Sequence, residues 1–420
     1  MAKLAKWLLA VFASSALVLA SSVAGAATTA DKAPLRIAWI DPLSGPMANL
    51  GELEVAEFKY IAEQINEAGG MDGHPVEIVP LDNKLSVQET LVQFQSAMDK
   101  GIRYILNGNG DPFAAAVINA TNQHNQRDPK DRVVYLNYAA IGPQFVNSDC
   151  SFWQFLFDAN TDMKMNILTK YVAKQKNIRK VFLIDQNYGF GHRVASDAMK
   201  DLKKVDPSVK IVGDVFTPLA KTKDFTPYVT QIKASGADAV ITGNWGSDLT
   251  LLMKAAGESG LRIPFFTYYG DLPGTVTDIG RPGVGTLYVV NEMNGDGTNP
   301  MIRKWQDELK KQTGHDFSFM PPAYALLTLE HAVAKAHSID PTKVAFALQG
   351  LRYDGPYGDV VMRSDNHQFE FPMFMTVLAD HMPNGLAKTG DLNFRAIEKF
   401  TAQDSSLPTT CKMKRPARPQ

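Results

Sequence analysis

The sequence predicts an α/β protein made of two doubly wound lobes, each with a parallel, Rossmann-like sheet. Short apolar segments alternate with amphipathic ones from residue 36 to about residue 136, and the loops between them are short. The alternation starts again after Cys150, which indicates a second sheet of the same type. Two such lobes leave a cleft between them, and a cleft is the usual place for a small-molecule site.

The first lobe contains four predicted strands, each an apolar run bounded by turn residues. These strands are expected at residues 36–40, 76–81, 104–106 and 133–136. Helices are expected at residues 52–68, 87–99 and 113–123, where apolar side chains recur with helical spacing. Gly69 and Gly70 end the first of these helices, because glycine readily takes the left-handed conformation found just after a helix.

The second lobe repeats this pattern and then departs from it. Strands are expected at residues 181–184, 211–216, 239–243, 265–268 and 287–290, and helices at 161–174, 194–202, 225–234 and 248–259. Further helices are predicted at 300–313, 323–336 and 341–349. Segments 360–362 and 374–378 are interpreted as an antiparallel hairpin rather than another βα unit.

Residues 181–192, VFLIDQNYGFGH, give the first candidate for a functional side chain. An apolar strand is followed by turn-forming residues and then by a helical pattern. Ligands of open α/β sheets bind outside the carboxyl ends of the strands, so Tyr188 is placed where a ligand would be touched. The alternative interpretation is that Tyr188 only caps the loop.

The N-terminus has the pattern of a secretory signal peptide, residues 1–26. Lys3 and Lys6 precede an apolar run, and small residues lead to a cleavage site after Ala26. The run is shorter than a membrane anchor needs and is broken by serines. We therefore expect an exported, soluble protein.

The charge of the chain argues against nucleic acid as a partner. The 420 residues carry a formal net charge of −1, which becomes −3 when Lys3 and Lys6 leave with the signal peptide. The body of the chain has no basic block, whereas binding to phosphates needs a concentrated basic surface.

Cys150 and Cys411 are the two cysteines of the sequence. In an oxidising compartment, two otherwise lone cysteines are expected to form a disulfide. This bond would pin the proline-rich, basic tail at residues 407–420 to the body of the protein.

The sequence lacks the usual signatures of enzymes. Gly108-Asn109-Gly110 follows a strand, but the third glycine of a dinucleotide-binding loop is missing. Phosphate-binding loops, nucleophile elbows and zinc-protease motifs are also missing, and the eight histidines are scattered without metal-ligand spacing. We therefore expect no catalysis, no cofactor and no metal.

Several short motifs occur in a characteristic order between Leu35 and Leu378. They are SGP at 44–46, NEAGG at 66–70, GHPVE at 73–77 with Asp82, Asp185 with Tyr188 and Gly189, DFT at 224–226 with IK at 232–233, GADA at 236–239, Gly260 and Leu261 with Pro264, Tyr324, and Gly358 with DNH at 365–367. In order and spacing the chain resembles the periplasmic solute-binding proteins of the branched-chain amino acid type, which feed ABC importers.

The resemblance implies the type I periplasmic binding protein fold, whose lobes are joined by three hinge crossings and close over a ligand. It places the N-terminal lobe at residues 34–155 plus 291–353 and the C-terminal lobe at 156–290 plus 356–385, followed by a C-terminal extension at 386–420. It implies a monomer that captures a small solute and delivers it to an ABC permease in the inner membrane. The alternative is a ligand sensor that signals to a partner receptor.

The resemblance also implies which residues surround the ligand. The expected ligand-binding residues are Asn109, Gly110, Asp111, Tyr138, Ala139, Ala140, Tyr188, Asn244, Trp245, Tyr269, Asp271 and Phe319. Tyr188 matches a ligand-contacting tyrosine of the family. Trp245 stands in place of another tyrosine, and Tyr269 in place of the acid that binds the ligand ammonium group.

The same comparison shows where this sequence departs from the family. Asn109, Gly110 and Asp111 stand where the family has a loop whose serine and backbone groups bind the ligand carboxylate, and the carboxylate of Asp111 would repel another. Asp271 is a candidate for the missing acid. The rings expected in the pocket, Tyr138, Tyr188, Trp245, Tyr268 and Tyr269, favour a flat, apolar or cationic ligand. The expected ligand is thus an amino acid or a related compound, aromatic and cationic compounds included.

Overall fold

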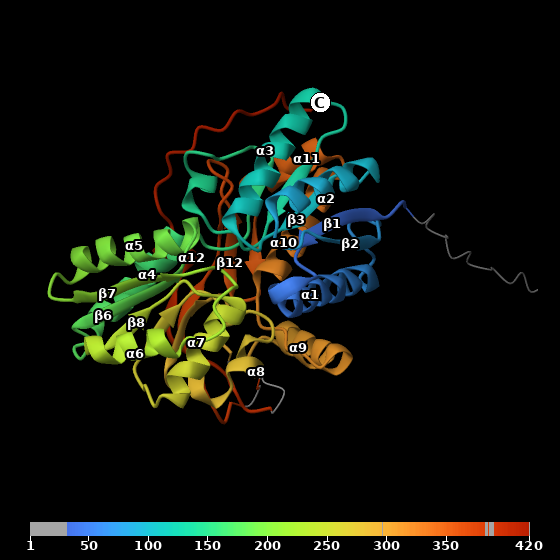
Figure 1. The fold of residues 1–420 in the computed structure, drawn as a ribbon. Coiled ribbons are helices and arrows are strands. Elements are labelled where there is room, and N and C mark those ends of the chain that lie inside the picture. The colour runs from blue at the N-terminus through green and yellow to red at the C-terminus, as the bar shows by residue number, and fades with distance from the viewer. Residues whose placement is uncertain (1–31, 296, 383–384, 386–389, 420) are drawn as a thin grey trace, which may run out of the picture.

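The structure is a computed structural model that describes residues 32–295, 297–382, 385 and 390–419. It contains two α/β lobes, each with its own largely parallel sheet, as predicted (Figure 1). The predicted signal peptide, residues 1–26, lies outside the described residues. Within the described ranges, no helix combines the length and the apolar character that crossing a membrane requires.

The first lobe is built on a five-stranded parallel sheet in the order β2-β1-β3-β4-β5. Its strands are β1 (Leu35–Asp41), β2 (Val76–Asp82), β3 (Tyr104–Asn107), β4 (Val134–Asn137) and β5 (Gln154–Leu156). β5 was not predicted, because its three residues are too few to show a period. All residues of β3 and β4 are buried, as expected of parallel strands covered by helices on both faces.

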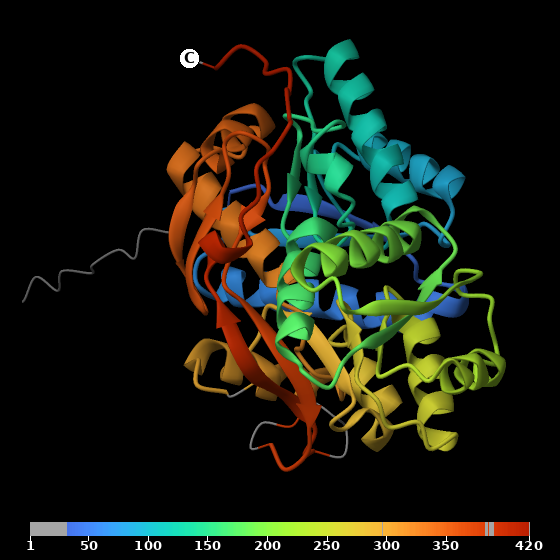
Figure 2. The same cartoon turned by 90° about the vertical axis from the view of Figure 1, so that its left-hand side faces the viewer.

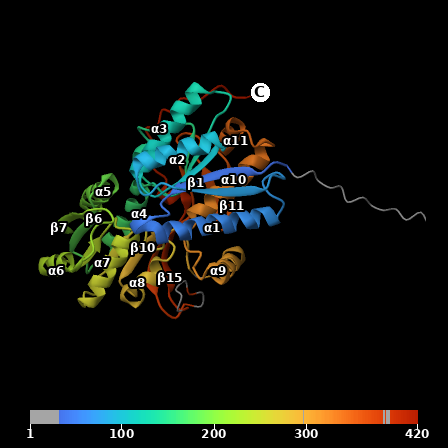
Figure 3. The same ribbon diagram turned by 45° about the vertical axis from the view of Figure 1, so that its right-hand side comes forward.

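Helices from distant parts of the chain cover this first sheet. They are α1 (Ala48–Glu67), α2 (Val87–Asp99), α3 (Asp111–Arg127), α10 (Pro321–Ala336) and α11 (Pro341–Leu348). α10 contacts α1 and α11 contacts β4, so a segment that follows the second sheet in sequence returns to the first lobe (Figure 3). α9 (Pro300–Thr313) also contacts α1.

The second lobe is built on a seven-stranded sheet in the order β15-β14-β10-β9-β8-β6-β7. Its strands are β6 (Lys180–Gln186), β7 (Lys210–Thr217), β8 (Ala239–Ile241), β9 (Phe265–Thr267), β10 (Leu287–Asn291), β14 (Met373–Ala379) and β15 (Asn393–Phe400). The first five of these run parallel, whereas β14 and β15 are antiparallel to their neighbours. The helices of this part of the chain are α4 (Thr161–Lys174), α5 (Gly189–Val205), α6 (Thr226–Ser235), α7 (Gly246–Glu258) and α8 (Thr275–Ile279).

The predicted hairpin of residues 360–362 and 374–378 is wrong. The first segment belongs to β12 (Gly358–Met362), which pairs with β11 (Arg352–Gly355) and β13 (Phe369–Glu370) in a small separate sheet. The second belongs to β14, which pairs with β10 and β15. Both segments are apolar runs, and the flanking strands that compete for their edges were not recognised in the sequence.

Within the described residues the chain passes between the lobes after β5, after β10 and after β13, and the tail that follows β15 passes back to the first lobe. The backbone N–H of Leu156 donates to the carbonyl oxygen of His367 at 3.0 Å, which joins the end of β5 to the small sheet. The first and third crossings therefore lie close together, as a hinge between two lobes requires.

The C-terminal segment belongs to both lobes. β15 extends the second sheet, and after the short helix α12 (Ala402–Ser405) the tail runs along the first lobe (Figure 2). The predicted disulfide between Cys150 and Cys411 is confirmed and fastens the tail there. The hydroxyl of Thr409 also donates to the carbonyl oxygen of Val146 at 2.7 Å.

Candidate ligand-binding site

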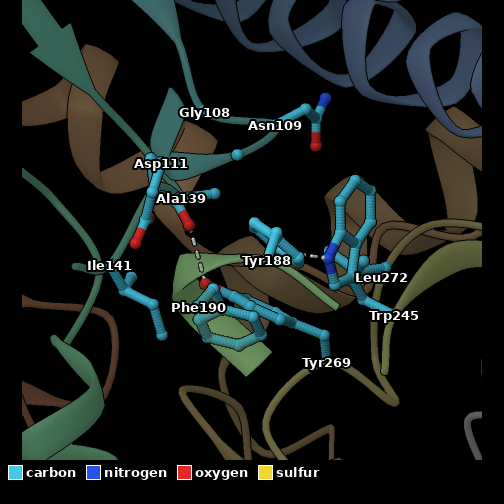
Figure 4. A pocket seen from close by; sticks show the side chains of 12 residues that line it. Gly108, Asn109, Asp111, Ala139, Ile141, Tyr188, Phe190, Trp245, Tyr269 and Leu272 are labelled. Carbon is cyan, nitrogen blue, oxygen red and sulfur yellow. Dashed lines mark hydrogen bonds between the residues drawn. The ribbon is translucent and has the colours of Figure 1, made fainter. Parts of the chain in front are cut away.

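A pocket of about 310 Å³, including its mouth, lies between the two lobes at the carboxyl ends of their strands (Figure 4). Only about 20 Å³ of this space can hold the centre of a water-sized molecule, so the lining side chains nearly fill the pocket in this closed structure. The lining residues are Gly108, Asn109, Gly110, Asp111, Ala139, Ala140, Ile141, Tyr188, Phe190, Trp245, Tyr269 and Leu272. The first seven follow strands β3 and β4 of the first lobe, and the other five belong to the second.

The wall of the first lobe is held in place by Asp41 at the end of β1. Its buried carboxyl accepts hydrogen bonds from the backbone N–H of Gly108 at 2.8 Å and of Asn109 at 3.0 Å, and from the hydroxyl of Tyr138 at 2.7 Å. Burial raises the pKa of Asp41 to about 7, although these hydrogen bonds oppose the shift. A Cβ atom at Gly108 would lie 2.7 Å from the buried Tyr138 ring, so the close approach of this loop requires glycine.

The side chain of Asn109 turns away from the pocket (Figure 4). Its Nδ2 donates to Oε2 of Glu54 at 2.5 Å and to the hydroxyl of Tyr138 at 3.4 Å. Burial raises the pKa of Glu54 to about 8, and the Asp41 carboxylate adds to the shift. These buried contacts fix the loop, so Asn109 faces the pocket mainly with its backbone.

Asp111 is the first residue of α3 and carries the carboxyl of the pocket wall. Its Oδ1 accepts a hydrogen bond from the backbone N–H of Gly142 at 3.2 Å. Burial raises the pKa of Asp111 to about 6, opposed by hydrogen bonds from Gly142 and from the Gln144 side chain. At neutral pH this carboxyl is mainly ionised.

The wall of the second lobe is aromatic. Tyr188 precedes α5 and Trp245 precedes α7, so both rings stand where a strand end meets the start of a helix. Nε1 of Trp245 donates to the Tyr188 hydroxyl at 2.9 Å, which fixes the two rings relative to each other. Phe190 lies beside them, with its ring centre 5.8 Å from that of Tyr188.

Tyr269 connects the second lobe with the first. Its hydroxyl lies 2.7 Å from the carbonyl oxygen of Ala139 and 3.1 Å from Oδ2 of Asp158. The first contact crosses the cleft, so the lobes are closed in this structure. Burial raises the pKa of Tyr269 well above its usual value, and the Asp158 carboxylate adds to the shift.

Behind Tyr269 lies a buried charge cluster at the lobe crossings. Nζ of Lys164, in α4, lies 2.8 Å from Oδ1 of Asp158 and 2.8 Å from Oε1 of Glu292. Asp158 is in the first crossing and Glu292 is in the second. The ammonium group of Lys164 also lies 4.9 Å from the centre of the Tyr269 ring. Lys164 belongs to α4 and is not one of the residues that line the pocket.

The structure brings eight of the twelve predicted ligand-binding residues onto the pocket wall. These are Asn109, Gly110, Asp111, Ala139, Ala140, Tyr188, Trp245 and Tyr269. Tyr138, Asn244, Asp271 and Phe319 are buried but do not line it. Tyr138 is held behind Gly108, and Phe319 packs against Tyr269 at 6.2 Å between ring centres.

Sequence reasoning missed four residues of the wall and the charge cluster. The residues are Gly108, Ile141, Phe190 and Leu272. Helix α5 begins at Gly189, five residues before the predicted start, so Phe190 in its first turn reaches the pocket. The loop sequence YGFG could have indicated this. Tyr268, expected among the pocket rings, is buried beside Phe190 instead.

Among residues 32–295, 297–382, 385 and 390–419, no group of three or more histidine, cysteine or acidic side chains is arranged to hold a metal ion. The pocket wall offers rings, backbone groups and one carboxyl. This arrangement can bind a small molecule. A pocket shared by two α/β lobes is the arrangement of two-lobed solute-binding proteins.

The chain matches the periplasmic binding protein family over residues 34–382. It is 32% identical over 407 residues to Leu/Ile/Val-binding protein homolog 4 of Brucella abortus strain 2308, covering 94% of this chain and 96% of that one. The chain therefore belongs to the periplasmic binding protein family, in the Leu/Ile/Val-binding group of ABC-transporter solute-binding proteins, a family of non-enzymatic proteins.

Solved structures agree with this assignment. The leucine-, isoleucine-, valine-, threonine- and alanine-binding protein of Brucella ovis, in its closed conformation, matches with a TM-score of 0.80 and 31% identity over 91% of this chain and 100% of that one. A Rhodopseudomonas palustris BisB5 solute-binding protein in complex with 3,4-dihydroxybenzoic acid has a TM-score of 0.75 at 19% identity, covering 88% of this chain and 98% of that one, and shows the shared fold. The predicted type I fold is thereby confirmed.

Proposed function

We propose that this protein captures a small solute in the pocket between its lobes and delivers it to an ABC permease in the inner membrane. The observation that carries the proposal is the shared pocket, whose walls come from both lobes and are joined by the contact from Tyr269 to Ala139. A solute held there touches both lobes only when they are closed. Ligand contacts that exist only in the closed form can therefore drive closure.

The wall residues support a solute with an apolar or flat body. Tyr188, Phe190 and Trp245 present ring faces, and Ile141 and Leu272 add aliphatic surface. The Brucella ovis relative is named for binding leucine, isoleucine, valine, threonine and alanine, and the Rhodopseudomonas palustris protein holds 3,4-dihydroxybenzoic acid. We infer a ligand of this kind, an amino acid or a related compound, for the pocket of this protein.

A thermal-shift screen of the mature chain, residues 27–420, tests this proposal. The panel contains amino acids, aromatic acids, amides and amines. A ligand present at 100 times its Kd adds about 2.7 kcal/mol to the free energy of unfolding, which is readily detected. Mass spectrometry should then recover the ligand unchanged. Excess of a reaction product over protein, or the absence of any stabilising ligand in the panel, would contradict the proposal.

The permease as partner and the monomeric state remain predictions. Size-exclusion chromatography of the mature chain should give a single species of monomer mass with and without ligand. Crosslinking in membrane extracts, with ligand present, should capture a membrane permease. Capture of a signalling receptor instead would favour the role of a ligand sensor.

A further inference from the structure

The residues that line the pocket include one charged side chain, and its charge is negative. Among the twelve lining residues, Asp111 alone has a side chain that is charged at neutral pH, and none is lysine, arginine or histidine. Arg193 of α5, whose charge acts on Asp111, lies outside the wall and pairs with Asp197 at 3.8 Å. A ligand carboxylate in this pocket would therefore have no cationic side chain on the wall to bind.

Asp111 keeps acceptor positions that its protein partners do not use. An ionised carboxylate accepts about four hydrogen bonds. Asp111 receives one from the backbone N–H of Gly142 and one from the Gln144 side chain. Its side chain is partly exposed and lines the pocket. The amide of Asn109 is engaged with Glu54, so Asp111 is the polar side chain of the first lobe that a ligand meets.

The wall of the second lobe supplies ring faces. The indole N–H of Trp245 is already donated to the Tyr188 hydroxyl, so this pair offers the ligand its rings (Figure 4). The face of an aromatic ring carries partial negative charge and attracts cations within about 6 Å. A carboxylate from one lobe and ring faces from the other are complementary to a small cation with an apolar body.

We propose that Asp111 sets the ligand class: it binds an ammonium head group and keeps carboxylates out of this part of the pocket. The inference rests on the proposed function, because it concerns the same pocket. The positive end of α3 would by itself favour an anion, but Asp111 lies in the first turn of that helix and offsets it.

A carboxylate ligand would have to bind with Asp111 protonated. Burial raises the pKa of Asp111 to about 6. The free energy needed to protonate this carboxyl therefore weakens the binding of a carboxylate ligand about tenfold at pH 7 and about a hundredfold at pH 8. An ammonium ligand meets the opposite condition, because it binds the ionised form that predominates above pH 6.

Two matched pairs of probes test the inference by isothermal titration calorimetry at pH 7.5. They are benzylamine with benzoate, and 3-methylbutylamine with leucine, which carries the added carboxylate. Each amine should bind the wild-type chain at least tenfold more tightly than its partner. Asp111→Asn should weaken amine binding at least tenfold and strengthen carboxylate binding. Asp128→Asn, an exposed carboxylate at the other end of α3, should change neither.

The pH dependence of the wild-type chain is a second measurement, useful if Asp111→Asn does not fold. Amine affinity should fall about tenfold from pH 7 to pH 5, while benzoate affinity rises. Among the groups acting on Asp111, Arg193 stays charged. The phenols of Tyr135, Tyr188 and Tyr269 stay neutral, because burial holds their pKa values well above the usual range.

The remaining outcomes overturn the inference. One is tighter binding of leucine or benzoate than of the matching amine, with no gain in Asp111→Asn. Another is the absence of amine binding at millimolar concentration when the thermal-shift screen has found a ligand without an ammonium group. Both leave the proposed function standing, whereas a screen that finds no ligand at all contradicts the proposed function itself.

Discussion

Lys164→Met removes the buried ammonium group at the lobe crossings while nearly keeping the volume of the side chain. Lys164 contacts Asp158 and Glu292 at 2.8 Å each, and none of the three side chains is exposed to solvent. Removing one partner of a buried ion pair costs about 3–5 kcal/mol, because the other charge stays buried without compensation. Here two carboxylates lose their partner, and Asp271 adds further negative charge. We therefore expect Lys164→Met to lower the free energy of unfolding by about 4–5 kcal/mol at pH 8.

The cost should depend on pH, with a sign that the structure fixes. Burial raises the pKa of Asp158 to about 8 even beside Lys164, and the Glu292 carboxylate adds to the shift. Without the lysine this pKa rises further. A carboxyl with a raised pKa in the folded state contributes stability below its unfolded pKa of about 4, and this is lost as the pH rises. The wild-type chain gains most of the same stability over this range, because the pKa of its Asp158 is already about 8, so the cost of Lys164→Met should shrink by less than about 1 kcal/mol from pH 8 to pH 6.

Urea unfolding at pH 8 and pH 6, followed by tryptophan fluorescence, measures both effects. Lys174→Met is the matched control, because this lysine lies on the same helix and pairs with Glu398 at 2.6 Å, but is 58% exposed. It should cost less than about 1 kcal/mol at either pH. A cost below about 1 kcal/mol for Lys164→Met at pH 8, or a cost that is clearly larger at pH 6 than at pH 8, would refute this account of the cluster.

Three further predictions concern the tail, the pocket and one buried histidine. Replacing Cys150 and Cys411 together by serine should lower the free energy of unfolding by about 2–5 kcal/mol in urea titrations, and an unchanged midpoint would contradict this. Trp245→Ala should weaken ligand binding about ten- to a hundredfold in calorimetry, whereas Met199→Ala on the surface should not. His367 is fully buried, which lowers its pKa to about 3, so its contribution to stability is present above the unfolded pKa of about 6.5 and is lost as the pH falls. Between pH 7 and pH 5 the free energy of unfolding should therefore fall by about 2 kcal/mol less in His367→Gln than in the wild type. Parallel pH profiles of the two proteins would disprove this.

The cysteine pair and the pocket loops show how far residue types alone reach. Two cysteines allow one pairing, so their number and the export signal were enough to predict the bond between Cys150 and Cys411. Asp111, Tyr188 and Trp245 each follow an apolar strand. Tyr188 and Trp245 follow strands of one sheet, so their loops had to approach the same region, whereas Asp111 follows a strand of the other sheet and meets them across the cleft. The direction in which each side chain points was not contained in that argument.

Tyr138, Asp271 and Lys164 show where the argument failed. Tyr138 lies in a loop of the pocket, but its hydroxyl is bound by Asp41, 97 residues away in the sequence, and the ring points inward. Asp271 lies next to the wall residue Leu272 and yet is fully buried. Lys164 sits in an amphipathic helix, where lysine usually indicates a solvent-exposed position. Its partner Glu292 is 128 residues away.

The sequence by itself determined the alternation of strands and helices, the two parallel sheets, the loops that carry the pocket and the disulfide. Each of these depends on interactions between near neighbours in the chain, or on a pairing with one possible solution. The tertiary structure alone decided that β14 pairs with β10 and β15 rather than with β12. It also decided which of the predicted rings line the pocket, and that a lysine is buried at the crossings. A strand edge or a buried charge pairs with whichever partner the packed chain brings into contact with it. Local periodicity carries no information about segments more than a hundred residues apart.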